Sequence, residues 1–128
     1  MTLSPGDQIE LHVTPDPYLT YRYAGASGDF NPIHLDETFA KQVGLPGRIL
    51  HGLWTMAQVA RAVTETAGGP DKLASLKVEF RGMGQLEEEI TVSGEVSSVD
   101  GSIATAKLEA TQAGRRIIRN AVATIAGD

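Results

Sequence analysis

The chain has 128 residues, of which 41% are hydrophobic and 21% are charged, so it is long enough for one domain with a hydrophobic core. Its formal net charge of −5 argues against nucleic-acid binding, which needs clustered lysine and arginine side chains. No apolar run approaches the roughly 20 residues that span a bilayer, and neither a signal peptide nor a cysteine is present. We therefore expect one cytoplasmic domain, residues 1–128, that binds neither nucleic acid nor a membrane.

Three elements are expected in the first third of the chain. Alternating apolar residues predict a strand over residues 8–14, and helical turns are expected over 18–26. Residues 28–32 include glycine, asparagine and proline, so they are expected to form a loop. Asp36 is expected to cap a short helix that runs to about Val43, where glycine and proline stop it.

The longest helical signal begins at His51-Gly52 and runs to about Thr66, where Gly68-Gly69-Pro70 ends it. We expect this helix to bury one face against a sheet, because it is the one long helix that the pattern predicts. Apolar residues recur along it at helical spacing, namely Leu53, Met56, Ala57, Ala60 and Val63.

After the long helix, the apolar period changes from 3.6 to 2. The alternation predicts four long antiparallel strands around residues 76–80, 90–96, 103–108 and 117–125. Asp100-Gly101 is a strong signal for a tight turn between the second and third of these. The sequence therefore predicts an α+β fold in which an antiparallel sheet wraps around the long helix.

One loop segment carries the residues best suited to chemistry. It places an acid, Asp29, an amide, Asn31, and an imidazole, His34, within six positions, and Pro32 stiffens it. A carboxylate and an imidazole five residues apart cannot share a strand face, but on a bent loop they can converge on one water. Together they supply the two proton movements that adding or eliminating water requires. Asn31 is a candidate to orient either group by hydrogen bonding.

The start of the long helix offers a second candidate site for chemistry. Free backbone N–H groups and the positive end of the helix dipole favour a developing oxyanion there. Gly52 has no side chain, so a carbonyl oxygen could approach its N–H closely. A metal site of Asp29, His34 and His51 fits by ligand type, but it lacks a compact spacing such as His-x-x-x-His, and we expect no metal.

The run from Tyr23 to Asp36, followed by His51-Gly52, resembles the hydratase motif of the MaoC-like dehydratase family. That family includes the (R)-specific enoyl-CoA hydratases and the beta-type (3R)-hydroxyacyl-ACP dehydratase subunits of actinobacteria. The close match covers about residues 20–60, and the remainder agrees in element order. The resemblance implies a single hot-dog fold, in which a long central helix is wrapped by an antiparallel sheet.

The resemblance also implies an activity and a role for each motif residue. The activity is reversible hydration of trans-2-enoyl thioesters to (3R)-hydroxyacyl thioesters, with coenzyme A or acyl carrier protein (ACP) as the carrier and no redox cofactor or metal. Asp29 and His34 would hold the catalytic water, and the Gly52 N–H would bind the oxyanion. The supporting residues would be Asn31 in the loop, Pro32 as scaffold, and His51, whose imidazole is interpreted as structural.

The sequence departs from the family pattern in two places. After Phe80, members commonly carry a proline, apolar residues and a Gly-Asp turn, whereas this chain has Arg-Gly-Met-Gly-Gln-Leu-Glu-Glu-Glu over residues 81–89. This difference bears on the rim of the acyl pocket and on the partner interface. In some hydratases a serine of the long helix contacts the catalytic acid, and Ala60 stands there. Asp29 then has one orienting donor fewer.

Several alternatives stay open at the level of the sequence. The chain could be a hot-dog thioesterase, or a catalytic or non-catalytic subunit of a heteromeric dehydratase, and its partner is expected to be a second hot-dog subunit, as a homodimer or heterodimer. The length and shape of the acyl group are also open, and so is whether coenzyme A or ACP carries it.

Two sets of residues outside the motif also have alternative interpretations. Trp54 could line an acyl tunnel, or lie in the core or at a dimer interface. Arg115-Arg116, with Arg119, could hold phosphates, but a solvated strand edge is the favoured interpretation.

Overall fold

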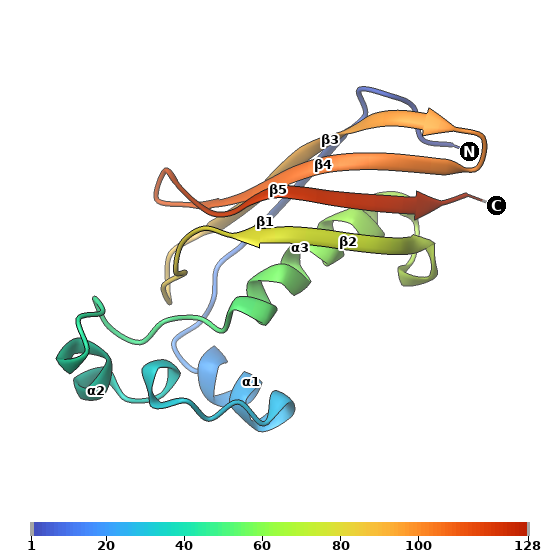
Figure 1. The fold of residues 1–128 in the computed structure, drawn as a ribbon. Coiled ribbons are helices and arrows are strands. Elements are labelled where there is room, and N and C mark those ends of the chain that lie inside the picture. Colours follow the sequence, from blue (N-terminus) through green and yellow to red (C-terminus); the bar gives the residue numbers. More distant parts are fainter. Residues whose placement is uncertain (1, 128) are drawn as a thin grey trace.

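The structure is a computed structural model, and it describes residues 2–127 (Figure 1). One strand and a set of short helices come first, then one long helix, then four strands. The elements in chain order are β1 (Gln8–Val13), α1 (Leu19–Ser27), the 3-10 helix η1 (Pro32–His34), α2 (Glu37–Gln42), α3 (Gly52–Ala67), the 3-10 helix η2 (Pro70–Lys72), β2 (Leu73–Phe80), β3 (Ile90–Asp100), β4 (Ile103–Gln112) and β5 (Arg115–Ala126).

All five strands form one antiparallel sheet in the order β1-β3-β4-β5-β2. Helix α3 lies along one face of this sheet, as Figure 1 shows, and the expected α+β arrangement is confirmed. The strands before and after the helices, β1 and β2, form the two edges.

Strand β5 lies between β4 and β2, so the interpretation of Arg115, Arg116 and Arg119 as a sheet edge is wrong. The reason is that the last strand pairs with β2, a partner that chain order does not reveal.

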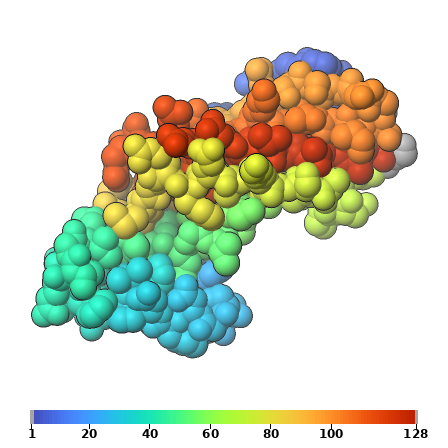
Figure 2. All heavy atoms as spheres, in the orientation of Figure 1, coloured from blue at the N-terminus to red at the C-terminus, as the bar shows by residue number. Residues whose placement is uncertain are grey.

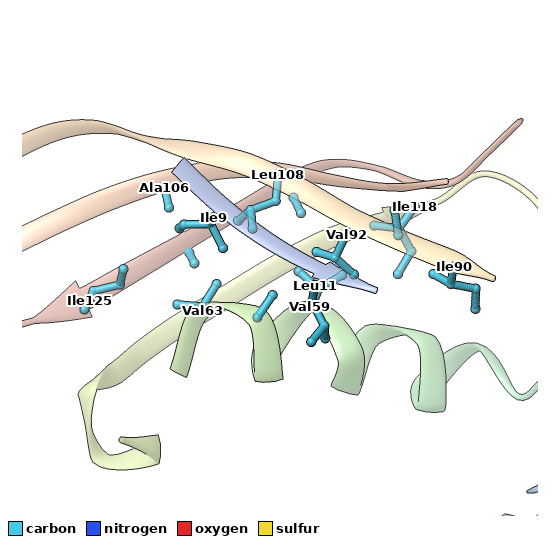
Figure 3. Packing of buried hydrophobic residues seen from close by; sticks show 14 of the residues in the cluster. Ile9, Leu11, Val59, Val63, Ile90, Val92, Ala106, Leu108, Ile118 and Ile125 are labelled. Atoms are coloured by element: carbon cyan, nitrogen blue, oxygen red, sulfur yellow. The ribbon is translucent and has the colours of Figure 1, made fainter. Parts of the chain in front are cut away.

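The hydrophobic core fills the space between α3 and the inner face of the sheet (Figure 3). Strand side chains alternate between the two faces, which is why Ile90, Val92 and Val96 of β3 and every second residue of β4 from Ala104 onward are buried. Val59 and Val63 of α3 meet these strands and are fully buried. The strand residues labelled in Figure 3 are Ile9, Leu11, Ile90, Val92, Ala106, Leu108, Ile118 and Ile125.

Most of the apolar residues that recur along α3 lie off the face that packs on the sheet. Of them, Val63 alone is buried, and Leu53 is 64% exposed. The buried face consists of Thr55, Gln58, Val59, Ala62 and Val63. Apolar residues cover more than one side of this helix, so their period predicts a helix but does not fix its rotation. Trp54 is half-buried and packs against the core.

The segment with α1, η1 and α2 forms a lobe at one end of the sheet, which Figure 2 shows in cyan and green. Asp36 caps α2 as expected, since its carboxylate accepts the Phe39 N–H at 3.0 Å. None of the helices within residues 2–127 is long and apolar enough to cross a membrane.

The Arg48 side chain links two segments of this lobe by hydrogen bonds. Its guanidinium is largely buried, and it donates to the Thr20 hydroxyl at 3.1 Å and to the Pro17 carbonyl at 3.0 Å. The same group lies over the Tyr21 ring, 4.7 Å from the ring centroid. Arg48 thus joins α1 to the segment that leads into α3.

We expect Arg48→Ala to lower the free energy of unfolding by about 3 kcal/mol, because it leaves the buried Thr20 hydroxyl and the Pro17 carbonyl without their charged donor. Urea denaturation measures this change. Arg61→Ala is the matched control, since its exposed pair with Glu65 is worth at most about 1 kcal/mol. Equal effects of the two substitutions would show that Arg48 does not anchor the lobe.

Candidate active site

The loop after α1 is shaped by local hydrogen bonds of its own residues. Gly28 ends α1 in the left-handed region at φ 79°, which glycine adopts without strain. The Asp29 Oδ1 then accepts the Asn31 N–H at 3.2 Å, and the Asn31 side chain accepts the Ile33 N–H at 3.2 Å. Pro32 opens the 3-10 turn that ends at His34. These turns fold the chain back and bring Asp29 and His34 to the same place.

Asp29 and His34 face each other across a short gap. The Asp29 Oδ2 and His34 Nε2 atoms are 3.8 Å apart, which is too long for a direct hydrogen bond. A water that binds both at about 2.8 Å fits this separation. The imidazole is 9% exposed and the carboxylate 52% exposed, so solvent reaches the gap from the side of Asp29.

One backbone contact sets the hydrogen positions of His34. Its Nδ1 lies 2.8 Å from the Ile49 carbonyl oxygen. Because a carbonyl only accepts, Nδ1 carries the hydrogen, and the neutral ring keeps its lone pair on Nε2. That lone pair lies at the gap opposite Asp29, where it can accept a proton from water.

His51 connects the two candidate catalytic residues. Its ring stacks on His34 with centroids 3.8 Å apart and planes at 22°. Its Nε2 donates to the Asp29 carbonyl oxygen at 3.0 Å, and the Tyr23 ring lies 4.7 Å from it. The buried His51 imidazole therefore contacts both the backbone of Asp29 and the ring of His34, which is the kind of contact that a structural role requires.

The same three side chains form a group whose possible metal-ligating atoms lie within 4.8 Å of one another. In stacked rings, the in-plane lone pairs of His34 and His51 run side by side rather than converging on one ion. The Nδ1 of His34 and the Nε2 of His51 already bond to carbonyl oxygens. This geometry favours acid–base chemistry over metal ligation.

Gly52 is the first residue of α3, so its N–H belongs to the free first turn of the helix. Trp54 and Thr55 donate to the His51 carbonyl, but the Gly52 N–H bonds to no acceptor within residues 2–127. A Cβ at this position would lie 3.3 Å from the exposed Phe80 ring. The Gly52 N–H is therefore an unused donor, and Gly52 lies beside the Phe80 ring.

Two hollows meet at Gly52 and Phe80. The first, of about 320 Å³, is lined mainly by apolar groups and includes Asp29 and His51. The second, of about 190 Å³, includes His34. A larger groove of about 630 Å³ lies on the outer face of the sheet, but none of these acid–base residues lines it. A ligand at Gly52 would thus have Asp29 on one side and His34 on the other.

The sequence did not indicate that Thr55 lies beside the candidate site. This residue is 4% exposed and lines the hollow of His34, one helical turn after Gly52. In the same helix, Thr64 and Thr66 bond back to carbonyls at 3.2 and 2.9 Å, whereas the Thr55 hydroxyl makes no hydrogen bond within residues 2–127. No fully buried side-chain polar atom in that range lacks a partner, so this hydroxyl reaches the hollow. Its spacing of three from Gly52 is the signal that could have found it.

Asn31 differs from the expectation. It was expected to orient Asp29 or His34 through its side chain, but that side chain caps the 3-10 turn instead. Its backbone N–H is what bonds to Asp29. An asparagine before proline satisfies the nearest free N–H of the turn, and this local bond takes precedence over a longer reach.

The sequence of this chain is similar to a known family of domains and to several known proteins. The sequence pattern described as "MaoC like domain" matches residues 3–116. The peroxisomal hydratase-dehydrogenase-epimerase of Saccharomyces cerevisiae is 42% identical over 76 residues, which cover 59% of this chain and 8% of that protein. The enoyl-CoA hydratase ChsH3 of Mycobacterium tuberculosis is 33% identical over 92 residues, which cover 70% of this chain and 31% of that protein. The chain thus spans less than a third of the length of these two relatives.

The fold is also that of a solved structure. The chain is similar to one in the ChsH1-ChsH2 complex of Mycobacterium tuberculosis, with a TM-score of 0.88, 25% identity and complete coverage of both chains. The order of elements and the five-stranded antiparallel sheet with its central helix agree with this likeness. The chain therefore belongs to the family of MaoC-like dehydratase domains that its motif predicts, and its fold is the hot-dog fold.

Proposed function

We propose that this chain adds water reversibly to trans-2-enoyl thioesters and forms (3R)-hydroxyacyl thioesters. The observation that carries this proposal is the pair of Asp29 and His34, 3.8 Å apart, beside the free N–H of Gly52. The two relatives named above support it, since their names describe a hydratase activity. No redox cofactor or metal takes part in the mechanism.

In this mechanism the thioester carbonyl oxygen accepts the Gly52 N–H. That bond, together with the positive end of α3, stabilises the enolate that forms when C3 is attacked. Asp29 and His34 hold the water between them. As the water oxygen bonds to C3, the pair accepts one of its protons and delivers a proton to C2 on the same face of the double bond. Dehydration is the reverse sequence.

In this proposal the Thr55 hydroxyl, which lines the hollow of His34, binds the reacting part of the substrate. We expect Thr55→Val to lower kcat/KM for crotonyl-CoA about tenfold, because it removes one hydrogen bond while keeping the shape of the side chain. Steady-state kinetics and a melting curve on the same sample measure the change. Thr64→Val is the control, since that hydroxyl bonds to the Arg61 carbonyl. Unchanged kinetics in Thr55→Val would remove Thr55 from the site.

The purified chain with crotonyl-CoA tests the function against its two rivals. Loss of the conjugated enoyl absorbance without release of free thiol is the expected result. Release of thiol would identify a thioesterase, which attacks the thioester carbon itself. No reaction, with or without a candidate partner subunit, would contradict catalysis by this chain.

We propose further that a second hot-dog subunit covers the site. Leu53, Phe80 and Met83 leave apolar side chains 64%, 53% and 47% exposed around the two hollows. Strand β2, which leads to them, pairs on one side only and leaves a free edge. The similar chain of known structure belongs to a complex of two named components. Light scattering on the active protein tests this, and a fully active monomer would contradict it.

A further inference from the structure

Gln112 is a buried glutamine at the end of β4, and its side chain binds backbone groups of another segment. The residue is 1% exposed. Its amide oxygen accepts the Gln85 N–H at 2.7 Å, and its amide nitrogen donates to the carbonyl oxygens of Gln85 and Glu88 at 2.8 and 2.9 Å. A buried amide whose oxygen and nitrogen are both bonded fixes the backbone that it binds. Gln112 therefore holds the loop between β2 and β3, residues 81–89.

This β2–β3 loop, the segment that departs from the family pattern, depends on such contacts for its shape. Within residues 81–89 it has no helix and one isolated bridge. The Glu87 backbone lies in the left-handed region at φ 66°, and its N–H donates to the Pro15 carbonyl at 2.7 Å. Such a conformation is strained for a residue with a side chain and persists only where its surroundings hold it. Gln112 binds the backbone on both sides of Glu87.

The part of the loop that Gln112 holds lies against the backbone that leads into α3. Gln85 forms the isolated antiparallel bridge with Ile49, and the Leu50 N–H donates to the Gly84 carbonyl at 2.9 Å. A Cβ on Gly84 would be 2.7 Å from the Leu50 Cδ1, so the two segments are in close contact. In Figure 1, the chain after β2 lies at the end of the sheet nearest the α2 lobe. The position of the loop thus sets the position of Ile49 and Leu50.

Ile49 in turn contacts the base of the acid–base pair. Its carbonyl oxygen lies 2.8 Å from the His34 Nδ1, and its N–H donates to the Ile33 carbonyl at 3.1 Å. The first contact keeps the hydrogen of the neutral ring on Nδ1 and the lone pair on Nε2. A shift of Ile49 away from His34 weakens this bond, and the ring can then take either tautomer. A path of direct contacts therefore runs from Gln112 through Gln85 and Ile49 to His34.

The geometry points to Gln112 as a positioning residue, which acts through Gln85 and Ile49 to keep the hydrogen of His34 on Nδ1. This inference rests on the proposed function, in which the free lone pair of His34 Nε2 accepts a proton from water. Gln112 itself lines neither of the two hollows of the site. The competing hypothesis is that Gln112 stabilises the fold and has no effect on His34.

Two substitutions that keep the length of the side chain grade the number of its hydrogen bonds. Gln112→Met removes all three bonds and leaves an apolar side chain in the buried position. The carboxyl that Gln112→Glu introduces keeps its proton when buried, so it can accept one bond and donate one. Most of the β2–β3 loop is exposed or half-buried, so water can bind the backbone groups that are released. Both variants are therefore expected to fold, which melting curves verify.

Nitrogen-15 NMR of the imidazole rings, at a pH where they are neutral, measures the tautomer of His34 without any turnover. The chain has three histidines, and His12→Ala and His34→Asn assign their signals. We expect the Nδ1–H form of His34 in the wild type, a mixture of tautomers in Gln112→Met, and a smaller change in Gln112→Glu. The kcat for crotonyl-CoA should fall about tenfold in Gln112→Met, which is part of the contribution of a positioned base, and less in Gln112→Glu.

Ile125→Val is the control for a loss of stability alone. This side chain of β5 is 1% exposed, and its strand partners are Leu73 and Ala104, at the other end of the sheet from the β2–β3 loop. The substitution makes a small cavity in the core and leaves the contacts of Gln112 in place. It should lower the melting temperature, while the tautomer of His34 and the kcat stay at their wild-type values.

The outcomes separate this inference from the proposed function. A folded Gln112→Met variant that keeps the wild-type tautomer of His34 overturns the inference, whatever its activity. Failure of both variants to fold assigns Gln112 to the stability of the fold and also overturns the positioning role. A change of tautomer in a chain whose wild type does not hydrate crotonyl-CoA supports the link from Gln112 to His34 and contradicts the hydratase.

Discussion

Asp29→Asn and His34→Asn should each lower kcat/KM for crotonyl-CoA by about 10²–10⁴-fold, the range for a positioned acid or base. Asp29→Asn keeps an oxygen that can accept the Asn31 N–H and so preserves the turn. In His34→Asn, the amide N–H can replace Nδ1 as the donor to the Ile49 carbonyl, while the lone pair of Nε2 is lost. Both substitutions therefore remove proton transfer with little change in the fold, which melting curves can verify.

The double variant should lose little more than the worse single variant, because both side chains act on one water. His12→Ala is the matched control. This exposed histidine of β1 contacts Glu89 and Thr91 and lies outside the site, so its kinetics should match the wild type. Near wild-type turnover in either single variant would remove that residue from the mechanism.

The oxyanion role of Gly52 can be separated from its small size by two substitutions. Gly52→Ala keeps the N–H and adds a Cβ next to Phe80, an exposed ring that can move. Gly52→Pro removes the N–H. Proline is well tolerated at the first position of a helix, and the extended His51 backbone, at φ −67° and ψ 131°, suits a residue before proline.

We expect Gly52→Pro to have a kcat about 10²-fold below that of Gly52→Ala, which corresponds to about 3 kcal/mol for one oxyanion donor. The melting temperatures of the two variants should be similar. The competing hypothesis is that Gly52 is needed for packing. It predicts that both variants lose stability and activity together, and equal activities of the two variants would refute the oxyanion role.

The part of the site that the sequence predicts is the part made by local turns. Asp29, Asn31, Pro32 and His34 lie on one short loop, and the positions of Gly28 and Pro32 restrict how that loop can bend. The helices and strands are predictable for the same reason, since each depends on residues close in the chain. The start of α3 at Gly52 also agrees with its sequence signals.

Features that depend on distant pairings are not predictable in this way. The rotation of α3, which buries Thr55 and exposes Leu53, is set by where the sheet lies. Arg81 and Arg116 line one groove, and they meet there because the chain after β2 continues along the last strand. The apolar alternation identifies each of these strands, but it holds no information on their order in the sheet.

The most direct test of the central claim is to run the reaction of the purified chain with crotonyl-CoA in H₂¹⁸O and to locate the label by mass spectrometry. Water held between Asp29 and His34 attacks C3, so the account predicts one ¹⁸O atom in the hydroxyl group of 3-hydroxybutyryl-CoA, with (3R) configuration by chiral analysis. Label found instead in the carboxylate of free crotonate, or a (3S) product, would contradict it.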